Sequence, residues 1–78
     1  MSVSAYVLIQ TDVGRASIVA EEVGAIDGVS FADGVTGPYD VIARADADSI
    51  DDLGRLVVSK VQGIEGVTRT LTCPIVEL

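Results

Sequence analysis

A four-residue motif occurs twice in this chain, and its spacing limits the folds that the sequence can adopt. Ile26-Asp27-Gly28-Val29 returns as Ile64-Glu65-Gly66-Val67, at an offset of 38 in a chain of 78 residues. In both copies a glycine follows an apolar segment with helical spacing and precedes a β-branched run. Such a glycine is typical of the point where a helix ends and a strand begins. The repeat therefore predicts two β-α-β halves and the element order βαββαβ.

Hydrophobic periodicity places the individual elements. Short β-branched runs predict four strands, over residues 3–10, 29–35, 39–45 and 67–76. Apolar residues at three- and four-residue spacing predict two helices between them. We expect Thr11 or Asp12 to cap the first helix, which starts near Gly14, and Asp48 or Ser49 to cap the second.

Right-handed crossovers in the two halves specify the topology. They give an α+β, ferredoxin-like fold, with an antiparallel four-stranded sheet in the order 4-1-3-2 and both helices on one face. Pro74 removes a backbone donor, which agrees with a last strand at the edge of the sheet. Asp33-Gly34 suggests a bulge in the second strand.

Size, charge and cysteine content restrict the class of protein. The 78 residues form one domain, 1–78, near the size at which a single core is barely sufficient. One Cys and no His exclude a disulfide framework and a His-based metal site, and nothing indicates a cofactor. We expect Cys73 to be a buried structural thiol. A formal charge of −7 argues against nucleic-acid binding. Without a signal sequence or an apolar stretch near ~20 residues, the expected location is the cytoplasm, with no membrane attachment.

Two helices cover only one face of such a sheet, so the other face needs a partner. Strand alternation assigns to this face a mixture of large apolar, hydroxyl and charged side chains: Tyr6, Leu8, Asp40, Ile42, Arg44, Thr70 and Thr72. Arg69 then points to the opposite face. The mixture is too apolar for a fully hydrated surface, which favours sheet-to-sheet packing with a second copy, as in a dimeric αβ barrel. Tyr6, Leu8 and Ile42 are the expected dimer contacts.

The turn in the middle of the chain is the best candidate for a site. Gly37-Pro38 breaks the apolar pattern, and Asp40 follows within an apolar run. Asp40 can either accept hydrogen bonds from the ammonium group of a ligand or hold backbone amides of its own turn. Thr70 and Thr72 can either offer hydroxyls to that ligand or simply reflect the strand propensity of threonine. No nucleophile and base can be paired, so catalysis is not supported.

Two segments resemble the ligand-binding (RAM) domain of the Lrp/AsnC family of transcriptional regulators. They are Gly37-Pro38-Tyr39-Asp40-Val41 at the central turn and the threonine-rich last strand that begins at Gly66-Val67. The resemblance covers essentially the whole chain. It implies dimers that pack sheet to sheet and assemble further into octamers or decamers. It also implies amino acids or related effectors bound between dimers, at positions matching Gly37, Tyr39, Asp40, Thr70 and Thr72.

The resemblance also defines the expected function. Family members normally carry a helix-turn-helix domain before the first strand, so this chain looks like a stand-alone sensing module. It would modulate partners such as full-length regulators of the family without touching DNA. One alternative is an ACT-like amino-acid-binding module. Such modules often carry a glycine at the start of the first helix, and Asp12-Val13-Gly14 resembles that feature. A small dimeric αβ-barrel enzyme is less favoured, because such enzymes generally need a His, a Trp or a cofactor pocket.

Overall fold

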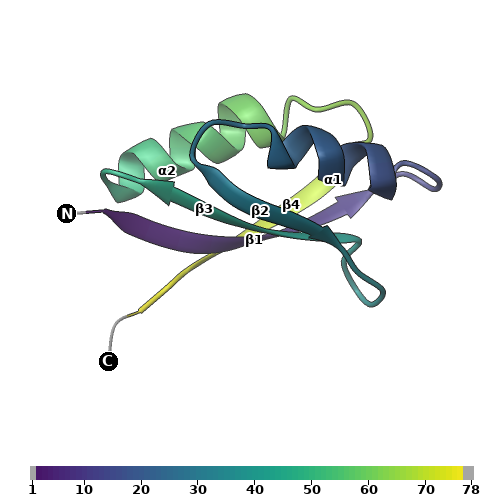
Figure 1. Ribbon diagram of the computed structural model, residues 1–78, viewed down its shortest axis with the longest axis horizontal. Helices are drawn as coiled ribbons and strands as arrows, with labels where there is room; N and C mark the ends of the chain where they lie inside the picture. Colours follow the sequence, from purple (N-terminus) through teal and green to yellow (C-terminus); the bar gives the residue numbers. More distant parts are fainter. Residues whose placement is uncertain (1, 77–78) are drawn as a thin grey trace.

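A computed structural model describes residues 2–76 and contains the predicted elements in the predicted order (Figure 1). They are β1 (Val3–Thr11), α1 (Ala16–Gly24), β2 (Val29–Gly34), β3 (Val41–Ala47), α2 (Ile50–Leu56), its continuation η1 (Val57–Val61) and β4 (Val67–Pro74). The strands form one antiparallel sheet in the order β2-β3-β1-β4, which is the predicted order read in reverse. Both helices lie on the same face of that sheet (Figure 1). The ferredoxin-like fold is confirmed.

The core lies between the helices and the two central strands. Alternate residues of β1 and β3 point toward the helices, as the twofold period of a strand requires. The buried core consists of Ala5, Val7, Ile9, Val19, Val23, Val41, Ala43, Ala45, Leu53, Val57 and Val61. Alanines on β1 and β3 leave room for the helices to approach the sheet closely. Within residues 2–76, no helix covers the opposite side of the same strands.

The two glycines of the repeat have the same structural role. Gly28 and Gly66 have φ values of 98° and 99°. Residues with a Cβ atom rarely adopt such positive φ values, whereas glycine does so readily. The carbonyl oxygen of Gly28 accepts the Asp46 amide at 2.7 Å, and that of Gly66 accepts the Asp12 amide at 2.8 Å. Each glycine therefore turns the chain out of a helix and fastens the turn to a neighbouring strand end.

Element boundaries differ from the prediction at several points. Thr11 still belongs to β1, and α1 starts at Ala16 behind Arg15, whose side chain makes no capping bond, so the cap predicted at Thr11 or Asp12 is wrong. The irregularity of β2 falls between Val29 and Phe31, earlier than expected. Pro74 does end a strand at the sheet edge, as predicted.

The second helix changes its pitch halfway. After Leu56 the backbone widens into a π-helical segment, in which the Gln62 amide donates to the Val57 carbonyl at 2.9 Å. Both Val57 and Val61 stay buried, so the wider turn keeps the apolar stripe on the sheet. At the other end Ser49 is the N-cap, as predicted, and its Oγ accepts the Asp52 amide at 3.1 Å.

Replacing Ser49 by alanine should destabilise the domain by about 1 kcal/mol, because the Asp52 amide loses its capping acceptor. For a domain of this size, thermal denaturation followed by circular dichroism should show a midpoint roughly 4–8 °C lower. Ser59→Ala, at an exposed position of η1, is the matched control and should not lower the midpoint. Equal midpoints for the two variants would show that the cap contributes nothing.

Candidate functional site

The central turn is fastened to the end of β1. Gln10 Nε2 donates to the Pro38 carbonyl at 3.0 Å, and the Asp40 amide donates to the Ile9 carbonyl at 2.9 Å. Gly37 lies at the exposed tip, with φ of 150°. These bonds hold Tyr39 and Asp40, both half-buried, at a fixed position beside the sheet.

The Asp40 carboxylate has one oxygen engaged. Its Oδ2 accepts the Thr11 backbone amide at 2.8 Å and lies 3.4 Å from the Thr11 hydroxyl. Asp40 therefore holds the end of β1 rather than amides of its own turn. Within residues 2–76, the hydrogen bonds to this side chain all go to Oδ2. Its Oδ1 is left for a further donor.

A shallow hollow opens beside Asp40, between the start of α1 and the end of β2. Its wall consists of Ala16, Ser17, Ala20, Gly34, Val35, Thr36 and Asp40. Ala16 and Ser17 lie in the first turn of α1, where backbone amides have no partner within the helix. The hollow thus combines one carboxylate, two hydroxyls and small apolar side chains at the start of a helix. Sequence reasoning missed the α1 residues, although small side chains at positions 16, 17 and 20 were a visible signal.

The two threonines of β4 do not lie where the sequence placed them. Thr70 pairs with Ile9 and Thr72 with Val7, and both partners are buried beneath the helices. Directly paired residues share a face, so Thr70 and Thr72 belong to the helix-covered side, which corrects the predicted assignment to the open face. Thr70 Oγ1 also accepts a hydrogen bond from Gln62 Nε2 at 2.8 Å.

The same register turns the intervening β4 residues toward the open face. Arg69 pairs with Gln10, Leu71 with Leu8 and Cys73 with Tyr6. Arg69 is therefore on the opposite side from the one predicted. Cys73 is exposed, so the expectation of a buried thiol is wrong.

The predicted effector residues come together only in part. Gly37, Tyr39 and Asp40 share the central turn, whereas Thr70 lies on the other side of β1 from Asp40. The segments that carry Asp40 and Thr70 are two strand spacings apart, which corresponds to about 10 Å. Within one subunit, Asp40 and the β4 threonines do not converge on one small group. The five-residue site stays a prediction, and it would need residues from more than one subunit.

The open face of the sheet has an apolar centre. Leu8 of β1 lies between Ile42 of β3 and Leu71 of β4, and the neighbouring row contains Tyr6 between Arg44 and Cys73. Phe31 of β2 extends that row. Tyr6 and Phe31 are each 39% exposed and Leu71 is 43% exposed, which is a large apolar surface for so small a domain.

Polar groups on this face contact one another and the Tyr6 ring. The Arg44 guanidinium lies 6.0 Å from the centre of the Tyr6 ring, and Arg44 Nε lies 3.9 Å from Asp46 Oδ1. The Ser4 hydroxyl donates to the same carboxylate. Tyr6, Leu8 and Ile42 therefore lie on the helix-free face, as predicted. Phe31 and Leu71 are additional members that sequence reasoning missed.

The fold, the open face and the hollow at the central turn together describe a small α+β domain. Comparison with known proteins gives the family. Residues 4–77 match the model of the Lrp/AsnC ligand binding domain, and the chain belongs to this family. The match decides in favour of this interpretation over the ACT-like alternative.

Individual relatives agree with the family match. An uncharacterised HTH-type transcriptional regulator of Pyrococcus furiosus is 31% identical over 75 residues, covering 92% of this chain and 50% of that protein. The chain spans between 36% and 50% of the length of the curated regulators it matches. A crystal structure from Thermus thermophilus superposes with a TM-score of 0.90 at 29% identity, covering 97% of this chain and 95% of that one.

A more distant structure shares the fold. The complex of a Neisseria meningitidis transcriptional regulator with L-Met has a TM-score of 0.84 at 16% identity, covering 96% of this chain and 50% of that one. As for membranes, no helix within residues 2–76 is long and apolar enough to span a bilayer.

Proposed function

We propose that this chain is an effector-sensing and oligomerisation module that binds amino acids or closely related small molecules beside Asp40. The observation that carries the proposal is the arrangement of that carboxylate. Asp40 is half-buried, has Oδ2 fixed by the Thr11 amide at 2.8 Å, and lines a hollow against the start of α1. A fixed carboxylate at the wall of a hollow is a suitable receptor for an ammonium group.

The rest of the hollow complements the other parts of an amino acid. Ser17 and Thr36 provide hydroxyls, and the start of the nine-residue α1 provides amides and the positive end of a helix dipole, which favour a carboxylate. Ala16, Ala20 and Val35 offer a small apolar wall to a side chain. One hollow thereby offers a partner to each of the two charges of a zwitterion.

The assembly would complete the site. Sheet-to-sheet packing through Tyr6, Leu8 and Ile42 gives a homodimer, and dimers assemble further, with octamers and decamers as the candidate sizes. Thr70 and Thr72 would reach an effector from a neighbouring subunit, together with Gly37 and Tyr39 of the turn. An effector that binds one assembly more tightly than another shifts the population between them, which makes the module a switch.

The relatives support a regulatory role over an enzymatic one. The curated matches are transcriptional regulators, and one regulator of the same fold was solved with L-Met, which supports amino acids as the effector class. The module would act on its own assembly or on full-length regulators of the family. We assign it no reaction, no cofactor and no contact with DNA.

Calorimetric titration with the twenty standard amino acids tests this function. At least one should bind the unmodified chain, and Asp40→Asn should weaken that binding at least roughly tenfold, because a charge-assisted hydrogen bond is lost. Ser17→Leu should weaken it as well, because the larger side chain fills part of the hollow while the Asp40 carboxylate is retained. Asp27→Asn, which removes an equal charge at an exposed position between α1 and β2, is the matched control and should bind normally. Undiminished binding by Asp40→Asn, or no binding by the unmodified chain, would refute the proposal.

A further inference from the structure

Within residues 2–76, which include all five basic residues of the chain, no basic side chain lines the hollow beside Asp40. The Asp40 carboxylate is the charged group of its wall. Arg44 and Arg69 lie on the open face of the sheet, on the side away from the helices. Lys60 is exposed on η1. These three cations thus belong to other surfaces of the domain.

Arg15 is the basic residue nearest to the hollow in the sequence, because it directly precedes α1. Its side chain runs past Gly66, where an added Cβ would lie 3.1 Å from both Arg15 Cβ and Arg15 Nε. The Gly66 carbonyl accepts the Asp12 amide on the β4 side of the β1 end, whereas the Asp40 carboxylate accepts the Thr11 amide on the β3 side. The missing side chain of Gly66 therefore leaves room for Arg15 on the side away from Asp40.

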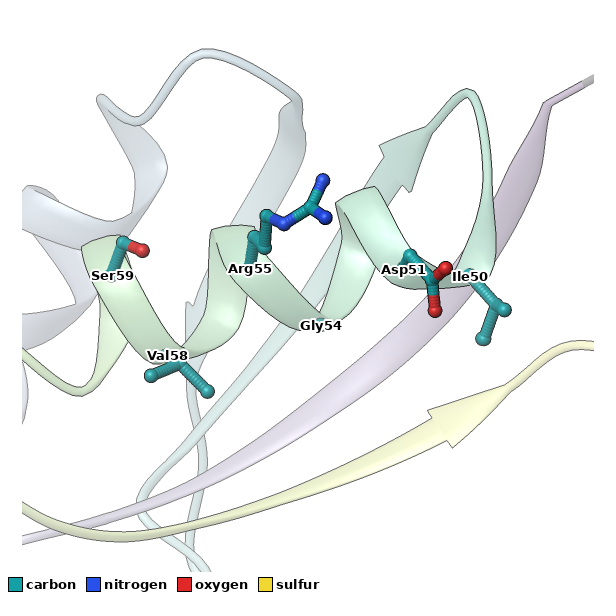
Figure 2. Close-up of a pocket in the computed structure, with 6 residues that line it drawn as sticks. All are labelled: Ile50, Asp51, Gly54, Arg55, Val58 and Ser59. Carbon is teal, nitrogen blue, oxygen red and sulfur yellow. The ribbon is translucent and has the colours of Figure 1, made fainter.

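Arg55 lines a different hollow, on the outer side of α2 (Figure 2). That hollow has both signs of charge, because Asp51 and Arg55 both line it. Arg55 also contacts Asp52 at 3.2 Å, so part of its charge is neutralised on its own helix. The hollow beside Asp40 differs from this one, because its wall offers negative charge without a balancing cation.

The two ends of a bound amino acid would therefore be held unequally. Its ammonium group would meet a full negative charge, which the Thr11 amide already fixes at 2.8 Å. Its carboxylate would meet the hydroxyls of Ser17 and Thr36 and the start of α1, where a helix dipole is equivalent to roughly half a positive charge. The formal charge of −7 on the whole chain attracts cations and repels anions in addition.

We propose that this hollow binds cationic amines without a carboxylate more tightly than it binds the corresponding amino acids. Amino alcohols and short aliphatic amines keep the ammonium group that Asp40 receives, and they lack the group that the surrounding charge disfavours. A hydroxyl in place of the carboxylate can still bond to Ser17 or Thr36. The inference rests on the proposed function, because it concerns the same hollow and names the ligand class that the hollow selects.

Calorimetric titration of the unmodified chain with matched pairs of ligands tests this selectivity. The pairs are L-alaninol with L-alanine, L-leucinol with L-leucine and L-methioninol with L-methionine. At about 20 mM salt, where charges are weakly screened, the amino alcohol of a pair should have a Kd at least roughly threefold lower than that of the amino acid. The N-acetyl amino acids keep the carboxylate and lose the ammonium group, and they should not bind.

Salt and one substitution identify the cause of the selectivity. Raising NaCl from about 20 mM to about 500 mM shortens the Debye length from about 20 Å to about 4 Å. The amino alcohols should then bind at least roughly threefold more weakly, and the amino acids should change less, because a zwitterion has no net charge. Asp40→Asn should weaken binding of the amino alcohols at least roughly tenfold, whereas Asp27→Asn should leave it unchanged.

The possible outcomes separate this inference from the proposed function. Amino alcohols that bind no better than their amino acids would overturn the inference and leave the function standing. Amino alcohols that bind while none of the twenty amino acids does would support the inference and refute amino acids as the effector class. Failure of all three pairs to bind, or amino-alcohol binding that Asp40→Asn leaves unchanged, would overturn the inference as well.

Discussion

Replacing Leu8 by lysine should leave each subunit folded and convert the protein into monomers. Leu8 is at the centre of the open face, directly between Ile42 and Leu71, so the proposed sheet-to-sheet dimer would bury the new ammonium group of each copy. Burying unpaired like charges costs several kcal/mol, and about 4 kcal/mol raises the Kd roughly a thousandfold. Size-exclusion chromatography with light scattering should report the 8.1 kDa mass of one chain.

Two comparisons make the Leu8 result specific. Val13→Lys introduces the same side chain at a loop residue that is fully exposed, and it should retain the mass of the unmodified protein. Phe31→Lys probes the next row of the open face, beside Arg44, and should also weaken the dimer. A Leu8→Lys protein that keeps its original mass while remaining folded would show that the open face is not the dimer contact.

Gly28→Ala should cause a large loss of stability for a substitution of one methyl group. The residue has φ of 98°, where a side chain costs roughly 1–2 kcal/mol. The added Cβ would also lie 2.8 Å from Leu56 Cδ1 and 3.2 Å from the Asp46 carbonyl oxygen. Moving the backbone would strain the bond from the Asp46 amide. We expect a total loss on the order of 2–4 kcal/mol, and a thermal midpoint lower by at least roughly 10 °C.

Gly24→Ala is the matched control for Gly28→Ala. Gly24 ends α1, and a Cβ there would make an ordinary contact with the Ala32 side chain at 3.8 Å. Alanine is favoured over glycine within a helix by about 1 kcal/mol, so this variant should melt at the same temperature or higher. If the two alanine variants melted together, the positive φ of Gly28 would not be a requirement of the fold.

The fold was predictable because several local signals agree on it. Gly28 and Gly66 were informative since a backbone in the left-handed region strongly favours glycine, and both lie where a helix meets a strand. Ser49, which is followed by acidic residues, was predicted as an N-cap of the second helix and caps α2. Pro74 predicted an edge strand since it cannot donate to a ladder. Each of these signals depends on the backbone conformation of its own segment, so the residue types in that segment are enough to indicate it.

The faces of β4 and the walls of the hollow depend on pairing between segments and were harder to predict. Thr70 and Thr72 alternate with Arg69 and Leu71, and both sets can face either way until the register with β1 fixes them. The pairing of β1 with β4 also shifts its register between Gln10 and Thr11. For the same reason the exposure of Cys73 was missed.

Other features depend on tertiary packing. The π-helical turn after Leu56 has no sequence signal of its own, and it keeps Val57 and Val61 on the sheet. Ser17 joins the hollow beside Asp40 only because α1 packs next to the end of β2. Asp40 was the basis for predicting a site at the central turn, whereas the residues across the hollow from it were not predicted.

Sedimentation equilibrium of the unmodified chain at low micromolar concentration tests most directly whether the open face of the sheet is covered by a second copy. We expect a mass that is twice 8.1 kDa or a multiple of that dimer mass, and a dimer that persists on dilution. A stable species of one chain at these concentrations, with Tyr6 and Leu8 facing water, would contradict it.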